Sequence, residues 1–269
     1  MPAAILYDAK EVARADHLVI FVPGVLSSIQ IFDAAKPHLP KNTASAYYRF
    51  PGLDGVPLAP ALQVDLAARE IALLADTYPN HELTLVGYSG GAAIVLEASQ
   101  LLGSPRAANL ALISPTPPFG GGLETRLRTT RDVLAVSVRL GTLDISKIWP
   151  EYWKVLAFGW DNYRSGARAE EVERLLERER SNIVIPRREI AKAHTQSLQR
   201  WELSSNFDAR RLRIGVFYGA KDPVFSEKQT EALIQQLGGA ERTQRYPDQG
   251  HIPIITEPRL FEDIFDFVR

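Results

Sequence analysis

Residues 84–93 read TLVGYSGGAA, and this stretch decides the fold class because its serine stands where two patterns meet. Residues 82–86 (ELTLV) have the pattern of a strand, whereas residues 90–102 (GGAAIVLEASQLL) favour a helix. The Gly-x-Ser-x-Gly motif alone is weak, because a random chain of this length contains one roughly one time in ten. The strand before Ser89 and the helix after it make this serine a candidate nucleophile.

Composition limits the classes of protein that the chain can belong to. Its 269 residues suit one large α/β domain, and 45% apolar with 23% charged residues are typical of a soluble globular protein. Lys and Arg (31) nearly balance Asp and Glu (32), so we expect no general attraction to nucleic acid. The sequence contains no cysteine, which excludes disulfides and thiolate chemistry.

The amino terminus carries charged residues where a secretory signal would need an apolar stretch. These residues are Asp8, Lys10, Glu11, Arg14 and Asp16. No apolar run approaches the roughly 20 residues of a membrane span. We therefore expect a cytoplasmic protein without a membrane span.

Strand-like runs alternate with helical patterns on both sides of the motif. Strands are predicted at 17–22, 44–50, 82–86, 109–114, 212–218 and 243–246, and helices at 29–38, 60–78, 90–102, 226–237 and 258–268. This alternation predicts a mostly parallel sheet with helices on both faces.

The alternation stops at Pro115. A Pro- and Gly-rich linker, PTPPFGGG, leads into helical patterns at 124–140, 148–160, 168–181 and 186–201. We therefore expect residues 1–115 and 209–269 to form an α/β core and residues 116–208 to form a helical insertion.

A serine hydroxyl needs a histidine to accept its proton and an acid to orient that histidine. Among the five histidines, His251 lies in a loop (YPDQGHIPI) between a predicted strand and the last helix. Asp222 (GAKDPVF) directly follows a strand, and parallel sheets place reactive groups at the carboxyl ends of their strands. Surface or packing roles are expected for the other histidines, which are His17, His38, His81 and His194.

The order Ser89, Asp222, His251 and the sequence GYSGG resemble the α/β-hydrolase superfamily over nearly the whole chain. The resemblance implies an α/β-hydrolase fold with a helical cap, or lid, inserted after the strand at 109–114. It also implies a strained serine, for which Gly87 and Gly91 relieve steric collision.

The same resemblance implies an oxyanion hole made of two backbone N–H groups. One belongs to Gly90 and the other to the loop VPGVLSS, where Val25 is the first candidate and Leu26 the alternative. Many relatives carry His-Gly where this chain has Pro23-Gly24. Because the backbone and not a side chain supplies the donor, this departure affects the geometry of the loop and not its ability to donate.

Two further carboxylates compete with Asp222 for the role of the acid. The stretch GLDG around Asp54 is similar to one in thioesterase domains of peptide and polyketide assembly lines. Those domains commonly carry their acid after the strand that corresponds to 109–114, which here ends in Ser114 without a carboxylate. We therefore expect a turn role for Asp54 and a loop role for Asp248.

The resemblance implies hydrolysis of a carboxylic ester or thioester through an acyl-enzyme on Ser89, with no metal or organic cofactor. The expected partner is a small acyl ester or thioester, and an acyl carrier is a further candidate. Candidate substrate contacts are Tyr88, Leu26, Trp149 and Trp153, although a tryptophan pair at helical spacing lies more often in a core. A C–C bond hydrolase and a non-catalytic ligand receptor stay open as alternatives.

Overall fold

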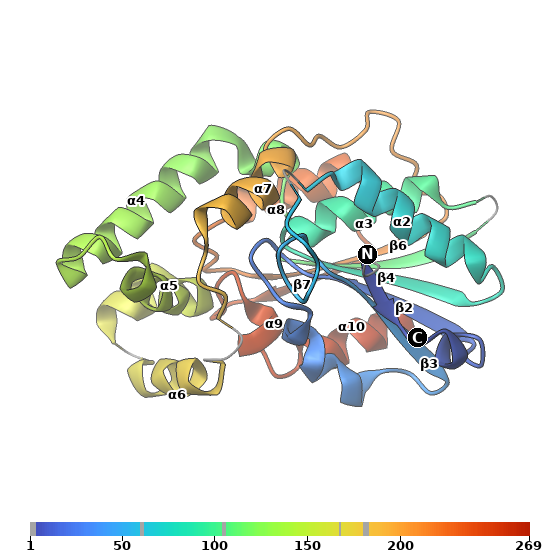
Figure 1. Cartoon of the computed structure of the whole chain (residues 1–269), viewed down its shortest axis with the longest axis horizontal. Coiled ribbons are helices and arrows are strands. Elements are labelled where there is room, and N and C mark those ends of the chain that lie inside the picture. Colours follow the sequence, from blue (N-terminus) through green and yellow to red (C-terminus); the bar gives the residue numbers. More distant parts are fainter. Residues whose placement is uncertain (1–3, 60–61, 104–105, 167, 180–182) are drawn as a thin grey trace.

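The computed structural model describes residues 4–59, 62–103, 106–166, 168–179 and 183–269, and its centre is a seven-stranded sheet (Figure 1). In spatial order the strands are β1 (Ile5–Tyr7), β3 (Thr43–Tyr48), β2 (His17–Val22), β4 (Glu82–Tyr88), β5 (Ala108–Ile113), β6 (Leu212–Gly219) and β7 (Arg242–Tyr246). Only the pair β1–β3 is antiparallel. β2 is buried along its whole length, as expected of an apolar strand in a covered parallel sheet.

Helices cover both faces of the sheet. One face carries α2 (Val64–Thr77), α3 (Gly90–Leu101) and α8 (Glu227–Gln236), and the other carries η1 (Ile29–His38) and α10 (Leu260–Val268). Successive residues of β4 show the division, since Leu85 packs in the first apolar core and Val86 in the second. The prediction of a mostly parallel sheet between two helical layers is confirmed.

The chain between β5 and β6 is helical. It contains η2 (Pro118–Gly121), α4 (Gly122–Leu140), α5 (Ile145–Ser165), α6 (Ala169–Glu179) and α7 (Arg188–Leu198). In Figure 1, α4, α5 and α6 lie together beside one end of the sheet. We call residues 118–198 the helical segment. α5 is broken at Gly159, whose backbone angles are φ 76° and ψ 172°.

The amino-terminal region differs from the pattern in the sequence. β1 and the short helix α1 (Ala9–Val12) were not predicted, because three and four residues are too few to show a period. η1 is a 3₁₀-helix with Pro37 inside it.

The remaining short helix is α9 (Pro253–Thr256). Throughout the described residues, no helix has the length and apolar character that a membrane crossing requires.

Candidate active site

Ser89 lies in a tight turn between β4 and α3. Its backbone angles are φ 50° and ψ −117°, a conformation that is strained for any residue with a side chain. Two glycines make room for the turn. A Cβ atom on Gly91 would lie 2.2 Å from the carbonyl oxygen of Val22, and one on Gly87 would lie 2.7 Å from the Cα of Ala92. Neither position therefore accepts a side chain.

The folded chain brings Ser89, His251 and Asp222 into one hydrogen-bonded row. Ser89 Oγ is 3.0 Å from His251 Nε2, and His251 Nδ1 is 2.7 Å from Asp222 Oδ2. The three residues follow β4, β7 and β6, at the carboxyl ends of parallel strands. A proton on Nδ1 is donated to the carboxylate, which leaves Nε2 to accept from the serine hydroxyl. All three side chains are more than 90% buried.

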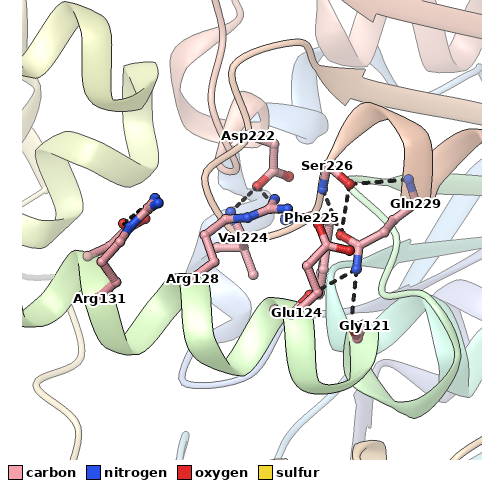
Figure 2. Close-up of polar contacts among 11 residues, drawn as sticks. Gly121, Glu124, Arg128, Arg131, Asp222, Val224, Phe225, Ser226 and Gln229 are labelled. Atoms are coloured by element: carbon pink, nitrogen blue, oxygen red, sulfur yellow. Dashed lines mark hydrogen bonds and ion pairs between the residues drawn. The ribbon is translucent and has the colours of Figure 1, made fainter.

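The second oxygen of Asp222 is fixed by its own loop. Asp222 Oδ1 accepts backbone N–H groups from Val224 at 2.7 Å and from Phe225 at 2.9 Å (Figure 2). The imidazole of His251 is flanked by the rings of Phe225 and Tyr88, with centroids 5.3 and 5.7 Å away. Burial raises the pKa of Tyr88 well above its usual range, so its phenol stays neutral beside the histidine.

Backbone carbonyls of α5 hold the loop that carries His251. His251 N–H donates to the carbonyl of Leu156 at 2.6 Å, and Gly250 N–H donates to that of Ala157 at 2.8 Å. In a continuous helix these carbonyls would accept from the next turn, but the break at Gly159 interrupts that pattern. The broken end of α5 therefore supplies acceptors to the histidine loop.

The two loop residues predicted as oxyanion-hole candidates, Val25 and Leu26, differ in their surroundings. A Cβ atom built on Gly90 would lie 3.6 Å from the backbone nitrogen of Val25, so the two residues are neighbours. Leu26 N–H is already engaged, because it donates to His194 Nδ1 at 3.3 Å. Within the described residues, neither Val25 N–H nor Gly90 N–H donates to a protein acceptor.

His194 is a site-supporting residue that the sequence did not reveal. Its side chain is fully buried on α7, and Nε2–H donates to the carbonyl of Pro51 at 2.7 Å. Burial lowers the pKa of His194, so the neutral ring keeps Nδ1 free to accept from Leu26. Its contact with Leu26 spans 168 residues of sequence, and no local pattern signals a contact of that range.

Asp54 and Asp248 lie away from His251 Nδ1, the position that Asp222 occupies. Asp54 accepts from the Ser28 hydroxyl at 2.5 Å and from Ile29 N–H at 3.0 Å, which caps the start of η1. Asp248 is exposed and pairs with Lys221 at 3.1 Å. Asp54 therefore braces the loop of Val25 from its far end.

A cavity of about 530 Å³ opens over Ser89. Its wall is largely apolar, and it includes the four candidate substrate contacts Leu26, Tyr88, Trp149 and Trp153. Other wall residues are Ile31, Tyr152, Leu156, Leu198, Val224 and Ile255. The described residues contain no cluster of His, Asp and Glu that could hold a metal ion.

Gln229 connects the core to the start of the helical segment. Its side chain caps α8 by accepting from Ser226 N–H at 2.9 Å. Its amide nitrogen donates to the carbonyl of Gly121 at 3.1 Å and to the Thr125 hydroxyl at 3.2 Å. Figure 2 shows α4 lying alongside the loop of Asp222, with Gln229 reaching across to Gly121.

Comparisons with known proteins agree with this architecture. The chain is similar to a thermophilic esterase from Thermogutta terrifontis (TM-score 0.68, 17% identity, 95% of this chain and 90% of that one). It is also similar to a lipase-esterase related protein from Clostridium acetobutylicum (TM-score 0.67, 15% identity, 98% of each chain). An esterase from Exiguobacterium antarcticum gives a TM-score of 0.71 at 13% identity, over 98% of this chain and 93% of that one.

At such low identities these structures establish the fold alone. A search of the curated proteins found no match. The family model described as "Alpha/beta hydrolase family" matches residues 19–264, nearly the whole chain. With this match and the architecture in agreement, the chain belongs to the α/β-hydrolase family.

Proposed function

We propose that the protein is a serine hydrolase that cleaves a carboxylic ester or thioester. The observation that carries this proposal is the row from Ser89 Oγ through His251 to Asp222, with separations of 3.0 and 2.7 Å, at the base of an apolar cavity. A buried serine with a histidine in hydrogen-bond reach, and a carboxylate behind it, has the arrangement needed for nucleophilic attack.

In the proposed first step, Ser89 Oγ attacks the substrate carbonyl while His251 Nε2 takes the hydroxyl proton. Asp222 stabilises the resulting imidazolium, and the N–H groups of Val25 and Gly90 donate to the oxyanion. Collapse of the tetrahedral intermediate breaks the bond to the leaving group, which receives the proton from His251. An acyl-Ser89 ester remains.

In the second step, His251 takes a proton from a water molecule that attacks the acyl-enzyme. The same two N–H groups bind the second oxyanion, and its collapse returns the proton to Ser89 and releases the acid. Every proton is accounted for by His251, so this mechanism requires no metal or organic cofactor. One oxyanion donor typically contributes about 3–4 kcal/mol of transition-state stabilisation.

The cavity supports a substrate with an apolar acyl or aromatic part. A cavity of about 530 Å³ lies within the usual range for sites that enclose a small organic molecule. Trp149 and Trp153 supply aromatic surface on the side of the helical segment. We include acyl thioesters, with an acyl carrier as one possible donor, because the same row of residues would cleave both bonds.

Labelling and a substrate panel test the proposal. A fluorophosphonate probe should add one phosphonyl group to the wild-type protein, seen by intact mass, and none to Ser89→Ala. Ser89→Ala should have a kcat at least about 1,000-fold lower than that of the wild type on short p-nitrophenyl esters and acyl-CoA thioesters. A folded wild-type protein that takes no label, and turns over neither substrate, would point to a ligand receptor instead. If the protein turns over thioesters and not esters, the hypothesis that it is a carboxylesterase is wrong.

A further inference from the structure

The mouth of the cavity over Ser89 is polar, although most of the wall is apolar. Three of the described wall residues are exposed, and all three are polar: Arg126 and Thr130 on α4, and Gln199 at the end of α7. The apolar residues of the wall are buried or half-buried. A molecule that fills the cavity therefore meets polar side chains where the cavity opens to solvent.

Arg126 carries the charge of this mouth, and its guanidinium is free to bind a ligand. It has no hydrogen bond, ion pair or ring contact to another described residue. The other three arginines of α4 are engaged within the protein, Arg128 by Glu124, Arg131 by Asp132 and Arg139 by the ring of Tyr163. No Asp, Glu or Lys of the described residues lines the cavity. The permanent charge of the wall is therefore a single positive one.

The start of α4 lies close to Gly90, the residue after the candidate nucleophile. A Cβ atom on Gly90 would lie 2.7 Å from Leu198 Cδ1, and one on Gly120 would lie 3.7 Å from the carbonyl oxygen of Leu198. One leucine therefore separates Gly90 from the residue two positions before α4. Arg126 follows in the second turn of this helix, and it lines the same cavity as Ser89. A molecule that fills the cavity can contact both side chains.

A guanidinium recognises anionic oxygen groups. Its parallel N–H groups donate two hydrogen bonds to a carboxylate or a phosphate, and the opposite charge strengthens both. Thr130 lies about one helical turn after Arg126 on the same face of α4, so its hydroxyl can donate to the same group. Because the mouth is exposed, an anion bound here keeps part of its water shell and avoids most of the cost of burying a charge.

We propose, on the basis of the proposed function, that the substrate carries an anionic oxygen group, a carboxylate or a phosphate, remote from the scissile carbonyl, and that Arg126 binds this group at the mouth of the cavity with Thr130 beside it. We call Arg126 and Thr130 the anion site. The apolar wall then binds the part of the substrate that joins the anion to the ester. Arg126 does not touch the reacting atoms, so the contact is the same in the ground state and the transition state and should lower KM rather than raise kcat.

Matched pairs of substrates that differ in charge at one end test the anion site. In the first arm, p-nitrophenyl monoesters of adipic, suberic and sebacic acids are compared with their ω-carboxamides, which have nearly the same shape. In the second arm, the anion lies in the alcohol, as in butyrate esters of ω-hydroxy acids compared with those of ω-hydroxy amides. A third arm uses butyrate esters of ω-hydroxyalkyl phosphates, with monobutyrates of the parent diols as neutral partners. At one chain length in one arm, the wild type should prefer the anion at least about fivefold in kcat/KM, through a lower KM.

Substitutions on α4 show whether Arg126 causes this preference. Arg126→Gln should reduce it to about twofold or less, and Arg126→Lys, which keeps the charge, should retain more of it than Arg126→Gln. Arg139→Gln is the matched control, because it removes the same charge from the same helix and Arg139 does not line the cavity. It should keep the wild-type preference. Arg126 is exposed, so these variants should fold, which thermal melting checks.

The outcomes separate the anion site from the proposed function. If the wild type cleaves the neutral esters but shows no preference for the anion in any arm, the anion site is wrong and the hydrolase stands. A preference that survives in Arg126→Gln, that is no greater in Arg126→Lys than in Arg126→Gln, or that is lost equally in Arg139→Gln also overturns the anion site. If no ester or thioester is cleaved and Ser89 takes no phosphonate, both proposals fall together.

Discussion

Replacing Gly159 by alanine should damage catalysis, although Gly159 is not among the wall residues of the cavity over Ser89. Gly159 has φ 76° and ψ 172°, angles that are open almost only to glycine. A Cβ atom there would lie 2.6 Å from the carbonyl oxygen of Lys221, the residue directly before Asp222. The perturbation therefore acts at the point where α5 meets the loop of the acid.

The magnitude follows from these two effects. Holding a non-glycine residue at such angles costs about 1–3 kcal/mol, which should appear as lost stability. Contacts of a Cβ atom closer than 3.0 Å are essentially never seen, so the segments must separate by about 0.4 Å or more. Because a misplacement of about 1 Å can cost about 100-fold in rate, we expect kcat to fall about 10- to 100-fold.

Denaturant unfolding and steady-state kinetics on one p-nitrophenyl ester measure both effects. Gly166→Ala is the matched control, because Gly166 ends the same helix at φ 67° and no atom of the described residues lies within 4 Å of an added Cβ. It should lose about 1–2 kcal/mol of stability and keep its kcat. The reasoning is refuted if Gly159→Ala keeps kcat within twofold, or if Gly166→Ala loses as much kcat.

Three other perturbations have defined outcomes. His194→Ala leaves Leu26 N–H without its acceptor, so kcat/KM should fall about tenfold and the free energy of unfolding by about 1–3 kcal/mol. Steady-state kinetics and denaturant unfolding measure these two quantities, and unchanged values would show that His194 does not support the site. Burial lowers the pKa of His194 and of His17 below 6.5 in the folded protein. As the pH drops from 7 to 5, the unfolded chain therefore binds more protons than the folded protein at these two histidines, and the free energy of unfolding should fall. Denaturation across that range should show a weaker slope in His194→Gln, and an equal slope would contradict this. Gln229→Ala should cost about 1 kcal/mol and speed amide exchange at 121–125, while kcat stays within threefold; unchanged exchange would show that its bond to Gly121 is dispensable.

The parts of the molecule that were predictable from sequence depend on local patterns. Buried parallel strands such as residues 17–22 are continuous apolar runs. The turn at Ser89 is marked by Gly87 and Gly91, at which any side chain would collide with the backbone. Asp222 and His251 could be found because each directly follows a strand or its turn. The partition into an α/β core and a helical insertion stays a prediction, as do the catalytic roles.

The parts that escaped prediction depend on contacts between distant segments. Gly159 lies within a helical pattern (AFGWDN), and a glycine there is compatible with either a continuous or a broken helix. The backbone of Lys221, which is far away in sequence, lies where a Cβ atom on Gly159 would be. The buried role of His194 likewise depends on Leu26 and Pro51, and no periodicity records such a pairing.

The hydrogen bonds from the histidine loop to α5 limit how freely this protein can be recombined with its relatives. A chimera that exchanged the helical segment between its linkers, in order to import another specificity, would also remove the carbonyls of Leu156 and Ala157. The transplanted helices would then have to offer two acceptors at the same place, or His251 would lose its backbone support. A graft that exchanges α4 and the start of α5 but keeps residues 155–160 is the smaller and safer exchange.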